Sequence, residues 1–509
     1  MNHGLLAGHA PPSRELLNAY LDSMDVWRSD GVAIADMASG GGWRAVATRD
    51  MAIGETICKL PKSALLSVRT TELNRFPAAA RERTTSHAIL SLALALLNEL
   101  RLGEESGFWG YIQSLPRETV PIPSLWPLYP AGSDAELADK WLDGTEARRD
   151  LKRREDEGVG LADMRAFYES SRLPRTRAHP DPSPFEAFAH AFSLVSTRAF
   201  IIDLHHTIAL CPFADVLNHA GVSHTSLASD DFVCHVCGSL APCEHDGTAE
   251  PARLAHLHPN ARARIANELD TVDMYVERAV RAGDEVMNSY GEGIGEARLL
   301  VEWGFVPGSA PAAGDESDDD EGFLGDGITW ALSELCDAER AAHWLAMDGG
   351  ELAGELFEAG ADDDARLVCA PSARPGVYHL NHAGQASARL FGALWLQGSG
   401  AHPADDVRGR LRRALASVEM AWEAHVADDD PLPLDSGVAD AVRAVVALLE
   451  RRRAGLPALT VDELYDAREA LADAPLQAAA LTVAINEVAL VQAALERWGE
   501  FAAWLEGDA

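Results

Sequence analysis

The spacing of apolar residues changes several times along this chain of 509 residues, and each change predicts a different kind of element. Between residues 31 and 67, short apolar runs alternate with glycine and proline, which is typical of a small antiparallel sheet. From residue 86 to 101, the run SHAILSLALALLNELR is long and apolar enough for a buried helix. Helical patterns separated by Pro-rich loops then continue to about residue 190, so we predict a helical insert at about 81–190.

A second β-rich stretch follows from about 201 to 305, interrupted by a Cys/His insertion at 231–246. Residues 308–327 are too rich in Asp, Gly, Ala and Pro to pack and predict an acidic linker. Beyond it the spacing is helical, with a capping-box sequence at 460–463. The pattern therefore predicts an α+β chain: a β-rich domain at 1–307, the linker at 308–327, and an all-α domain at 328–509.

Charge narrows the class of partner. Asp and Glu number 79 against 43 Lys and Arg, a formal charge of −36, which argues against nucleic acid and favours a basic protein. A solvated surface explains most of these carboxylates equally well. The acidic run at 315–321 has the same two interpretations, as a device that steers a basic substrate or as a solvated tether.

The cysteines and the apolar runs indicate where in the cell the protein is expected to be. The seven cysteines are odd in number and unevenly spaced, unlike a secreted disulfide framework, and predict a reducing compartment, cytoplasm or nucleus. The N-terminal residues do not resemble a signal peptide. The apolar stretch at 88–97 is well short of the ~18 residues that a membrane span needs, so we expect no membrane association.

Three separated segments carry candidate chemistry. They are GGGWRAVATRDMAIGETICKLPKSALLS at 40–67, CPFADVLNHAG at 211–221 and GDEVMNSYGEGIGEARLLVEWGFV at 283–306. The Asn-His pair of the second segment would, alone, more often be a turn than a site. In the third, the pattern predicts a strand at 285–290, a glycine-rich bend and a short amphipathic helix.

Together these segments resemble the SET domain of protein methyltransferases, whose second and third segments cross in a knot-like core. With FWGYIQSLP at 108–116 in the helical insert, the chain more narrowly resembles the Rubisco large-subunit methyltransferase-like branch, which includes fungal ribosomal-protein lysine methyltransferases and the actin histidine methyltransferase. The resemblance implies a β-rich SET domain, S-adenosylmethionine as cofactor, a C-terminal helical substrate-binding domain, and a lysine of a ribosomal or translation-factor protein as acceptor. Protein-histidine or histone-lysine methylation, and a catalytically silent SET-fold adaptor, stay open as alternatives.

The same resemblance implies roles for individual residues. Tyr290 corresponds to the catalytic tyrosine, and the guanidinium of Arg198 should grip the cofactor carboxylate. Two positions depart from the pattern: Arg44 stands where the family has a second glycine, and Gly295 where the branch usually has asparagine. The other residues expected along the cofactor are Gly42, Trp43, Arg44, Asp215, Asn218, His219 and Phe305.

The chemistry of methyl transfer agrees with these roles. A sulfonium methyl is already activated, so the protein must mainly align donor and acceptor without a metal. A lysine amine, with a free pKa near ~10.4, must lose its proton in a narrow apolar channel before it can attack. A tyrosine hydroxyl such as that of Tyr290 can hydrogen-bond the amine without adding a charge.

Two other motifs have competing interpretations. The glycines at 291–295 mimic a dinucleotide loop, but the third glycine comes one position early and the expected acidic residue would fall in the linker. In the insertion, a Cys-x-x-Cys followed by Cys-x-His could surround a structural zinc, although the second pair is tightly spaced; the alternative is a surface loop with reduced thiols. The four candidate ligands are Cys234, Cys237, Cys243 and His245.

Overall fold

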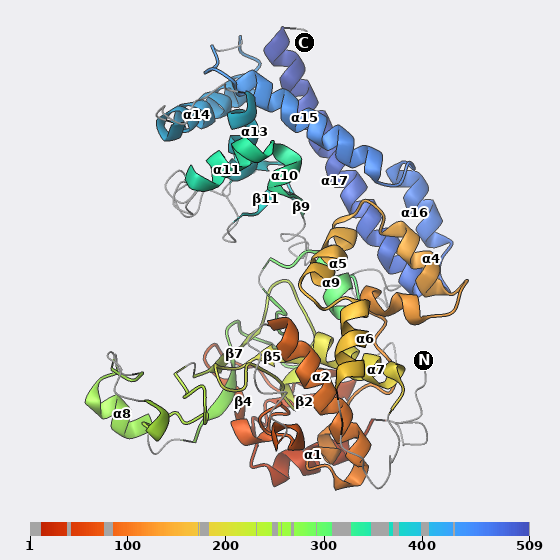
Figure 1. Cartoon of the computed structure of the whole chain (residues 1–509), viewed down its shortest axis with the longest axis vertical. Coiled ribbons are helices and arrows are strands. Elements are labelled where there is room, and N and C mark those ends of the chain that lie inside the picture. Colours follow the sequence, from red (N-terminus) through yellow and green to blue (C-terminus); the bar gives the residue numbers. More distant parts are fainter. Residues whose placement is uncertain are drawn as a thin grey trace.

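The computed structural model describes most of the chain: residues 12–37, 42–75, 85–171, 173, 183–230, 232–246, 253–255, 257–265, 269–291, 293–307, 327–347, 366–369, 376–398, 407–430 and 433–507. Figure 1 shows the N-terminal region, to residue 307, as the lower body and the C-terminal region, from residue 327, as an arm of long helices above it. Of the predicted linker only Gly327 is among the described residues, and it begins a strand.

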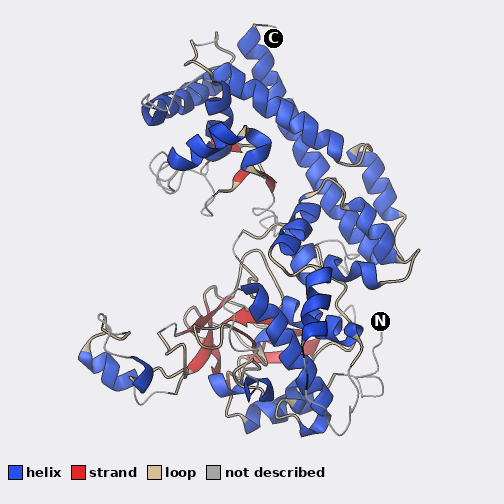
Figure 2. Ribbon diagram, viewed as in Figure 1, coloured by secondary structure: helices blue, strands red, loops and turns tan. Residues whose placement is uncertain are grey.

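The N-terminal region contains strands that lie among helices (Figure 2). Its strands are β1 (Trp27–Arg28), β2 (Val32–Asp36), β3 (Trp43–Ala47), β4 (Thr56–Pro61), β5 (Ala199–Ile201), β6 (Ile208–Leu210), β7 (Thr225–Ser229) and β8 (Thr271–Val276). Its helices are α1 (Arg14–Ser23), α2 (Thr85–Leu102), α3 (Trp109–Ile112), α4 (Asp134–Trp141), α5 (Glu146–Asp156), α6 (Leu161–Ser170), α7 (Phe185–Arg198), α8 (Pro259–Ile265) and α9 (Glu296–Trp303).

The strands form small antiparallel sheets. One has the order β1-β4-β8-β7, while β2 pairs with β3 and β5 with β6 as separate hairpins. In β8 the burial alternates residue by residue, as expected for a strand with one face on the core. Within the stretch at 31–67 that was predicted to form a small antiparallel sheet, β2, β3 and β4 are strands, whereas the apolar run at 64–68 contributes a single bridge, from Leu66 to Leu210.

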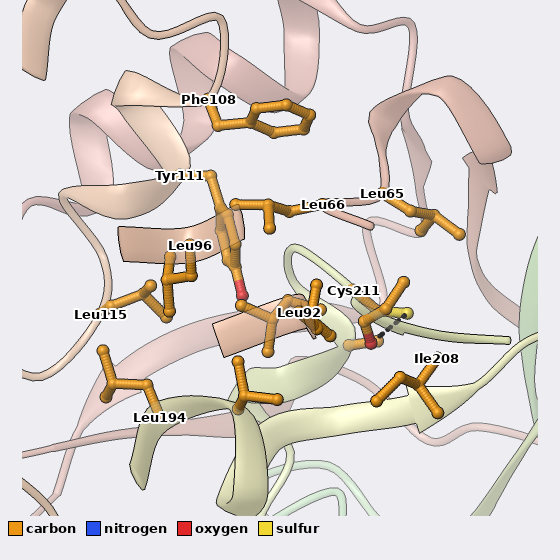
Figure 3. Packing of buried hydrophobic residues seen from close by; sticks show 14 of the residues in the cluster. Leu65, Leu66, Leu92, Leu96, Phe108, Tyr111, Leu115, Leu194, Ile208 and Cys211 are labelled. Atoms are coloured by element: carbon orange, nitrogen blue, oxygen red, sulfur yellow. Dashed lines mark hydrogen bonds between the residues drawn. The ribbon is translucent and has the colours of Figure 1, made fainter. Parts of the chain in front are cut away.

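A hydrophobic core joins these sheets to the helical insert. The predicted helix at 86–101 is α2, and it packs along α7 because both helices are apolar nearly all round. Figure 3 shows Leu92 and Leu96 of α2 around Tyr111 of α3, with Leu66 and Cys211 beside them. The insert thus shares its core with the strands that precede and follow it.

The C-terminal region is mainly helical, as predicted. Its helices are α10 (Leu332–Leu335), α11 (Ala338–Met347), α13 (Ala388–Gly398), α14 (Val407–Val426), α15 (Val438–Gly455), α16 (Val461–Glu469) and α17 (Pro475–Glu506). The capping box predicted at 460–463 is present at the start of α16. The spacing did not predict a small sheet of order β10-β12-β11-β9, formed by β9 (Gly327–Trp330), β10 (Val368–Cys369), β11 (Tyr378–Asn381) and β12 (Ala386–Ser387).

Helix α17 is long and apolar enough to cross a membrane by composition alone. However, 67% of its most apolar window is buried inside the protein, against α15, α16 and the insert. Its apolar character is that of a core helix.

The two regions meet along what we call the seam, the contact of α4, α5 and α9 with α15 and α17. A third hydrophobic cluster fills it, with Trp126, Leu300 and Val483 from three separate parts of the chain. Figure 1 shows α4 and α5 beside α17, the long helix of the C-terminal region. The seam fixes the C-terminal arm on the insert and on α9.

Candidate active site

Two of the segments singled out from the sequence run alongside each other. Asn288 N donates to Asn218 O at 2.8 Å, and Ala220 N donates to Asn288 O at 3.0 Å. These bonds form a parallel bridge between His219 and Asn288. We call this contact, of residues 217–220 with 288–290, the crossing. The predicted strand at 285–290 is present only as isolated bridges, because the segment changes partners from β3 to the crossing within a few residues.

The third segment, β3, lies against the same stretch. Ala47 N donates to Asp284 O at 2.9 Å and Val286 N to Ala45 O at 2.8 Å. Asn218 then links the segments through its side chain, whose Nδ2 donates to Glu285 Oε1 at 2.8 Å and approaches Trp43 O at 3.4 Å. Three stretches distant in sequence therefore meet at one point.

Tyr290 lies at the centre of an aromatic cluster at the crossing. Its backbone N–H donates to His219 Nδ1 at 3.2 Å, which orients the imidazole. Its ring lies 5.1 Å from that of His219, 5.4 Å from the stacked Trp303 and 6.3 Å, edge to face, from Phe305. These contacts fix the position of the phenol before any ligand arrives.

Burial sets the protonation of these rings. It raises the pKa of Tyr290 above its usual value and lowers that of His219, so both side chains are neutral near pH 7. The Tyr290 hydroxyl donates to Leu217 O at 3.4 Å. The phenol is thus a neutral group with a free lone pair.

Beneath the aromatic cluster lies a buried polar group. Asp215, in the turn at Ala214–Val216, accepts a hydrogen bond from the Tyr111 hydroxyl at 2.8 Å and lies 3.8 Å from Arg198 Nη1. Burial raises the pKa of Asp215, while Arg198 and the Tyr111 bond oppose that rise. Arg198 Nη1 also donates to Asp215 O at 2.8 Å, but its Nε is buried and has no hydrogen-bond partner among the described residues. The guanidinium is held in place while its buried Nε stays available to a ligand.

Two cavities meet at this point. The larger, about 1150 Å³, is lined by β3, the crossing and the end of α9. The smaller, about 700 Å³, lies between the helical insert, β5 and the crossing. Both are lined by Thr197, Arg198, Asp215, Tyr290 and Trp303, so the Tyr290 phenol lies at the boundary between them.

Most of the residues predicted to bind the cofactor line the larger cavity: Gly42, Trp43, Arg198, Asp215, Asn218, His219, Tyr290 and Phe305. Arg44 is not among its lining residues. The Arg44 side chain is 38% exposed, and its Nη1 lies 3.7 Å from Oε2 of Glu285, the residue whose other carboxylate oxygen accepts from Asn218. Gly295, the other departure, is the N-cap residue of α9 and has no side chain to cap it.

Sequence reasoning missed several lining residues. Trp303 and Thr197 line both cavities, and Glu285 lines the larger one. Trp303 had a usable signal, because it lies two residues before Phe305 in a segment already singled out. Glu285 had none, since a carboxylate at that position matters only through its contact with Asn218.

Comparison with known structures decides the fold. The SET domain of LSMT bound to lysine and AdoHcy matches with a TM-score of 0.60 and 17% identity, over 97% of this chain and 92% of that one. Rubisco LSMT bound to AdoMet matches with a TM-score of 0.59 and 18% identity, over 98% and 94%. The chain has the SET-domain fold of Rubisco LSMT. The fold predicted from the three motifs is thereby confirmed.

One curated relative supports the same resemblance. Ribosomal lysine N-methyltransferase 3 of Saccharomyces cerevisiae is 24% identical, and the match covers 52% of this chain and 57% of the yeast protein. The chain therefore matches little more than half the length of that relative. No protein-family model matches the chain.

Proposed function

We propose that this SET-fold protein transfers a methyl group from S-adenosylmethionine to a lysine side chain of another protein. The observation that carries the proposal is the meeting of two cavities at Tyr290, one for a donor and one for an acceptor. LSMT structures with this fold hold AdoMet, AdoHcy and lysine, and the yeast relative is named for a ribosomal substrate.

The larger cavity fits the cofactor. The unpaired, buried Nε of Arg198 provides a donor for the cofactor carboxylate, and the rings of His219 and Phe305 line the wall where adenine would lie. When bound, S-adenosylmethionine supplies a methyl group activated by the sulfonium charge. The residues expected to hold it are Gly42, Trp43, Arg198, Asp215, Asn218, His219, Tyr290 and Phe305.

The chain's own residues then align the acceptor. The lining of the smaller cavity includes Val195, Phe200 and Ile208, whose apolar side chains favour the neutral amine over the ammonium. The same lining also contains charged residues, among them Glu157 and Glu302. Tyr290 lines both cavities, and its neutral hydroxyl is bonded to the carbonyl of Leu217, a residue that lines the smaller one. In this arrangement Tyr290 is the catalytic residue, because it orients the amine towards the methyl group.

For the substrate class, we propose a basic ribosomal or translation-factor protein. The charge of −36 and the yeast relative's name support this choice over histone tails. None of the seven cysteines, all of which lie in described parts of the chain, forms a disulfide, which supports a reducing compartment, cytoplasm or nucleus, as the place of reaction.

The first test is cofactor binding by calorimetry. Wild-type protein should bind S-adenosylmethionine in the micromolar range, and Asn218→Ala should weaken binding about tenfold, because it removes the link between β3, Glu285 and the crossing. Asn18→Ala, on the exposed face of α1, is the matched control and should bind as the wild type does.

The second test identifies the acceptor. Incubation with labelled cofactor and cell extract, followed by mass spectrometry of the labelled band, should give a methylated lysine in a basic protein. A methylated histidine would correct the acceptor while retaining the methyltransferase. Absence of both binding heat and label in the wild-type protein would replace the proposal with a silent SET-fold adaptor.

A further inference from the structure

The Cys/His insertion brings its four candidate ligands together. One ligand atom from each of Cys234, Cys237, Cys243 and His245 lies within 4.8 Å of all the others. Cys243 Sγ lies 3.8 Å from His245 Nδ1. Tetrahedral zinc with bonds of about 2.0–2.3 Å separates its ligand atoms by roughly 3.4–3.8 Å, so a small contraction of this cluster would complete the site.

The first pair of ligands lies on a tight turn. Gly238 N donates to Cys234 O at 2.7 Å and Cys234 N to Ser239 O at 2.9 Å, with Gly238 at a φ of +73°. Cys234 and Cys237, at the two sides of this turn, thus contribute two of the four clustered ligand atoms.

The second pair is set by a separate turn. The short Glu244–Asp246 turn directs His245 back towards Cys243, and Asp246 Oδ2 accepts from Cys243 N at 2.8 Å. Arg253 fixes this turn, because its Nε donates to Asp246 Oδ1 at 2.7 Å and its Nη2 to Ala241 O at 2.9 Å. The close spacing of Cys243 and His245 is therefore accommodated by the turn.

The insertion has almost no core of its own. Among its described residues Val233 and Leu240, with the nearby Leu254, are buried, and none of them belongs to the three hydrophobic clusters of the protein. A segment with so little buried apolar surface needs another source of stability, which small folds commonly obtain from a metal.

We propose that Cys234, Cys237, Cys243 and His245 bind one structural zinc ion. Three thiolates and an imidazole favour zinc over harder cations, and binding releases the thiol protons. Four protein ligands leave no open coordination position, so the ion takes no part in methyl transfer.

The position of the insertion gives the ion a specific task. His205, in the turn between β5 and β6, packs its ring against Gly238, and its Nδ1 lies 3.2 Å from His235 O. Phe200 and Ile201 of β5 line the smaller cavity. The metal site thus supports the turn between β5 and β6, which directly follows the two β5 residues that line the smaller cavity.

Metal content and cobalt spectroscopy test the proposal. Protein purified without chelator should contain about one zinc per chain, and Cys237→Ser or Cys243→Ser should lower that content about tenfold. Cobalt added to the zinc-free protein should give thiolate charge-transfer absorption in the near ultraviolet and strong visible bands typical of tetrahedral coordination. Cys336→Ser, a cysteine of the C-terminal region, is the matched control and should retain zinc and both spectra.

These readings do not depend on methyltransferase activity. Circular dichroism of each variant checks that it is folded, and Cys237→Ser should keep the helical signal of the wild type, since the cluster lies outside the hydrophobic cores. Wild-type protein that is folded, retains no zinc and gives no thiolate–cobalt band would overturn the proposal. Equal zinc content in wild type, Cys237→Ser and Cys243→Ser, or a disulfide between Cys234 and Cys237 in freshly purified protein, would do the same.

Discussion

The crossing and the seam each contain an arginine that is paired with carboxylates, and the two arginines differ in how fully they are hydrogen-bonded. At the crossing, Arg198 is held by Asp215 through one nitrogen, while its Nε has no hydrogen-bond partner among the described residues. At the seam, Arg452 donates to both Glu487 and Glu146, at 2.9 and 2.7 Å. One site retains an unused donor that a ligand can take, whereas the other pairs its cation with two carboxylates.

The remaining seam contacts show how completely those carboxylates are bonded. Glu146 N, at the start of α5, donates to Glu487 Oε2 at 2.8 Å. Thr329 N and Oγ1 donate to the two oxygens of Glu146 at 2.9 and 2.6 Å. A polar cluster bonded in this way joins the two regions, and substitutions there should affect stability more than ligand binding.

The largest expected effect comes from removing the central cation of the seam. Arg452→Leu leaves the carboxylates of Glu146 and Glu487 buried without their partner and should lower the free energy of unfolding by about 3–5 kcal/mol. Arg443→Leu is the matched control on the same helix, where Arg443 pairs with Asp440 and Glu506 in solvent and contributes at most about 1 kcal/mol. Denaturant titration measures both free energies of unfolding. Equal losses for the two substitutions would show that the buried Arg452 contributes no more to stability than the exposed Arg443.

The opposite result is expected at the crossing. Tyr290→Phe keeps the ring contacts with His219, Trp303 and Phe305 and removes only the hydroxyl, which makes one long bond to Leu217 O. We expect kcat to fall at least about 100-fold, equivalent to about 3 kcal/mol, with little change in stability. Tyr275→Phe on β8 is the control. A Tyr290→Phe variant that is less stable but keeps the wild-type kcat per folded molecule would show that the hydroxyl contributes to stability and not to catalysis.

The sequence could predict the crossing because its chemistry is concentrated in short segments. Asn218 and His219 are adjacent, and Tyr290 and Phe305 lie in one run of 24 residues at 283–306. The short motifs therefore identify the candidate site residues, although only folding brings the separate segments together.

The seam had no such local signal. Glu146 and Arg452 are 306 positions apart, and Glu146 and Glu487 are 341 apart, so no spacing rule connects them. The small C-terminal sheet was missed for a related reason: its strands are two to four residues long, too short for an alternating pattern to show. Trp303 was missed because a tryptophan on an amphipathic helix is more often core than site.

The pH dependence of stability sharpens the comparison further. Burial and the neighbouring Glu146 raise the pKa of Glu487 to about 7, although Arg452 opposes the rise. The folded protein then holds a proton that the unfolded chain releases near pH 4.5, so stability falls as pH rises from about 4.5 through 7. We expect a loss of roughly 2 kcal/mol over this window, measured by denaturant titration, relative to Glu487→Gln. A pH profile identical in the two proteins would contradict the raised pKa.

The smallest effect concerns the first turn of α17. Its own N-cap residue, Ala474, has no side chain that can accept a hydrogen bond, and Asp134 of α4 replaces it by accepting from Leu476 N at 2.8 Å and Gln477 N at 3.1 Å. Asp134→Ala should therefore cost about 1 kcal/mol of stability, as loss of a cap usually does.

A local cap gives the matched comparison. Thr460→Ala removes the cap of α16 from within the same segment and should cost about as much, ~1 kcal/mol, without loosening the seam. Hydrogen exchange separates the two, because only Asp134→Ala should speed exchange of the Leu476 and Gln477 amides. If Thr460→Ala speeds those amides equally, α17 frays with the C-terminal helices and the insert does not hold its end. If only Asp134→Ala does so, a residue more than three hundred positions away caps this helix, and the seam fixes the C-terminal arm through the helix end as well as through its buried charges.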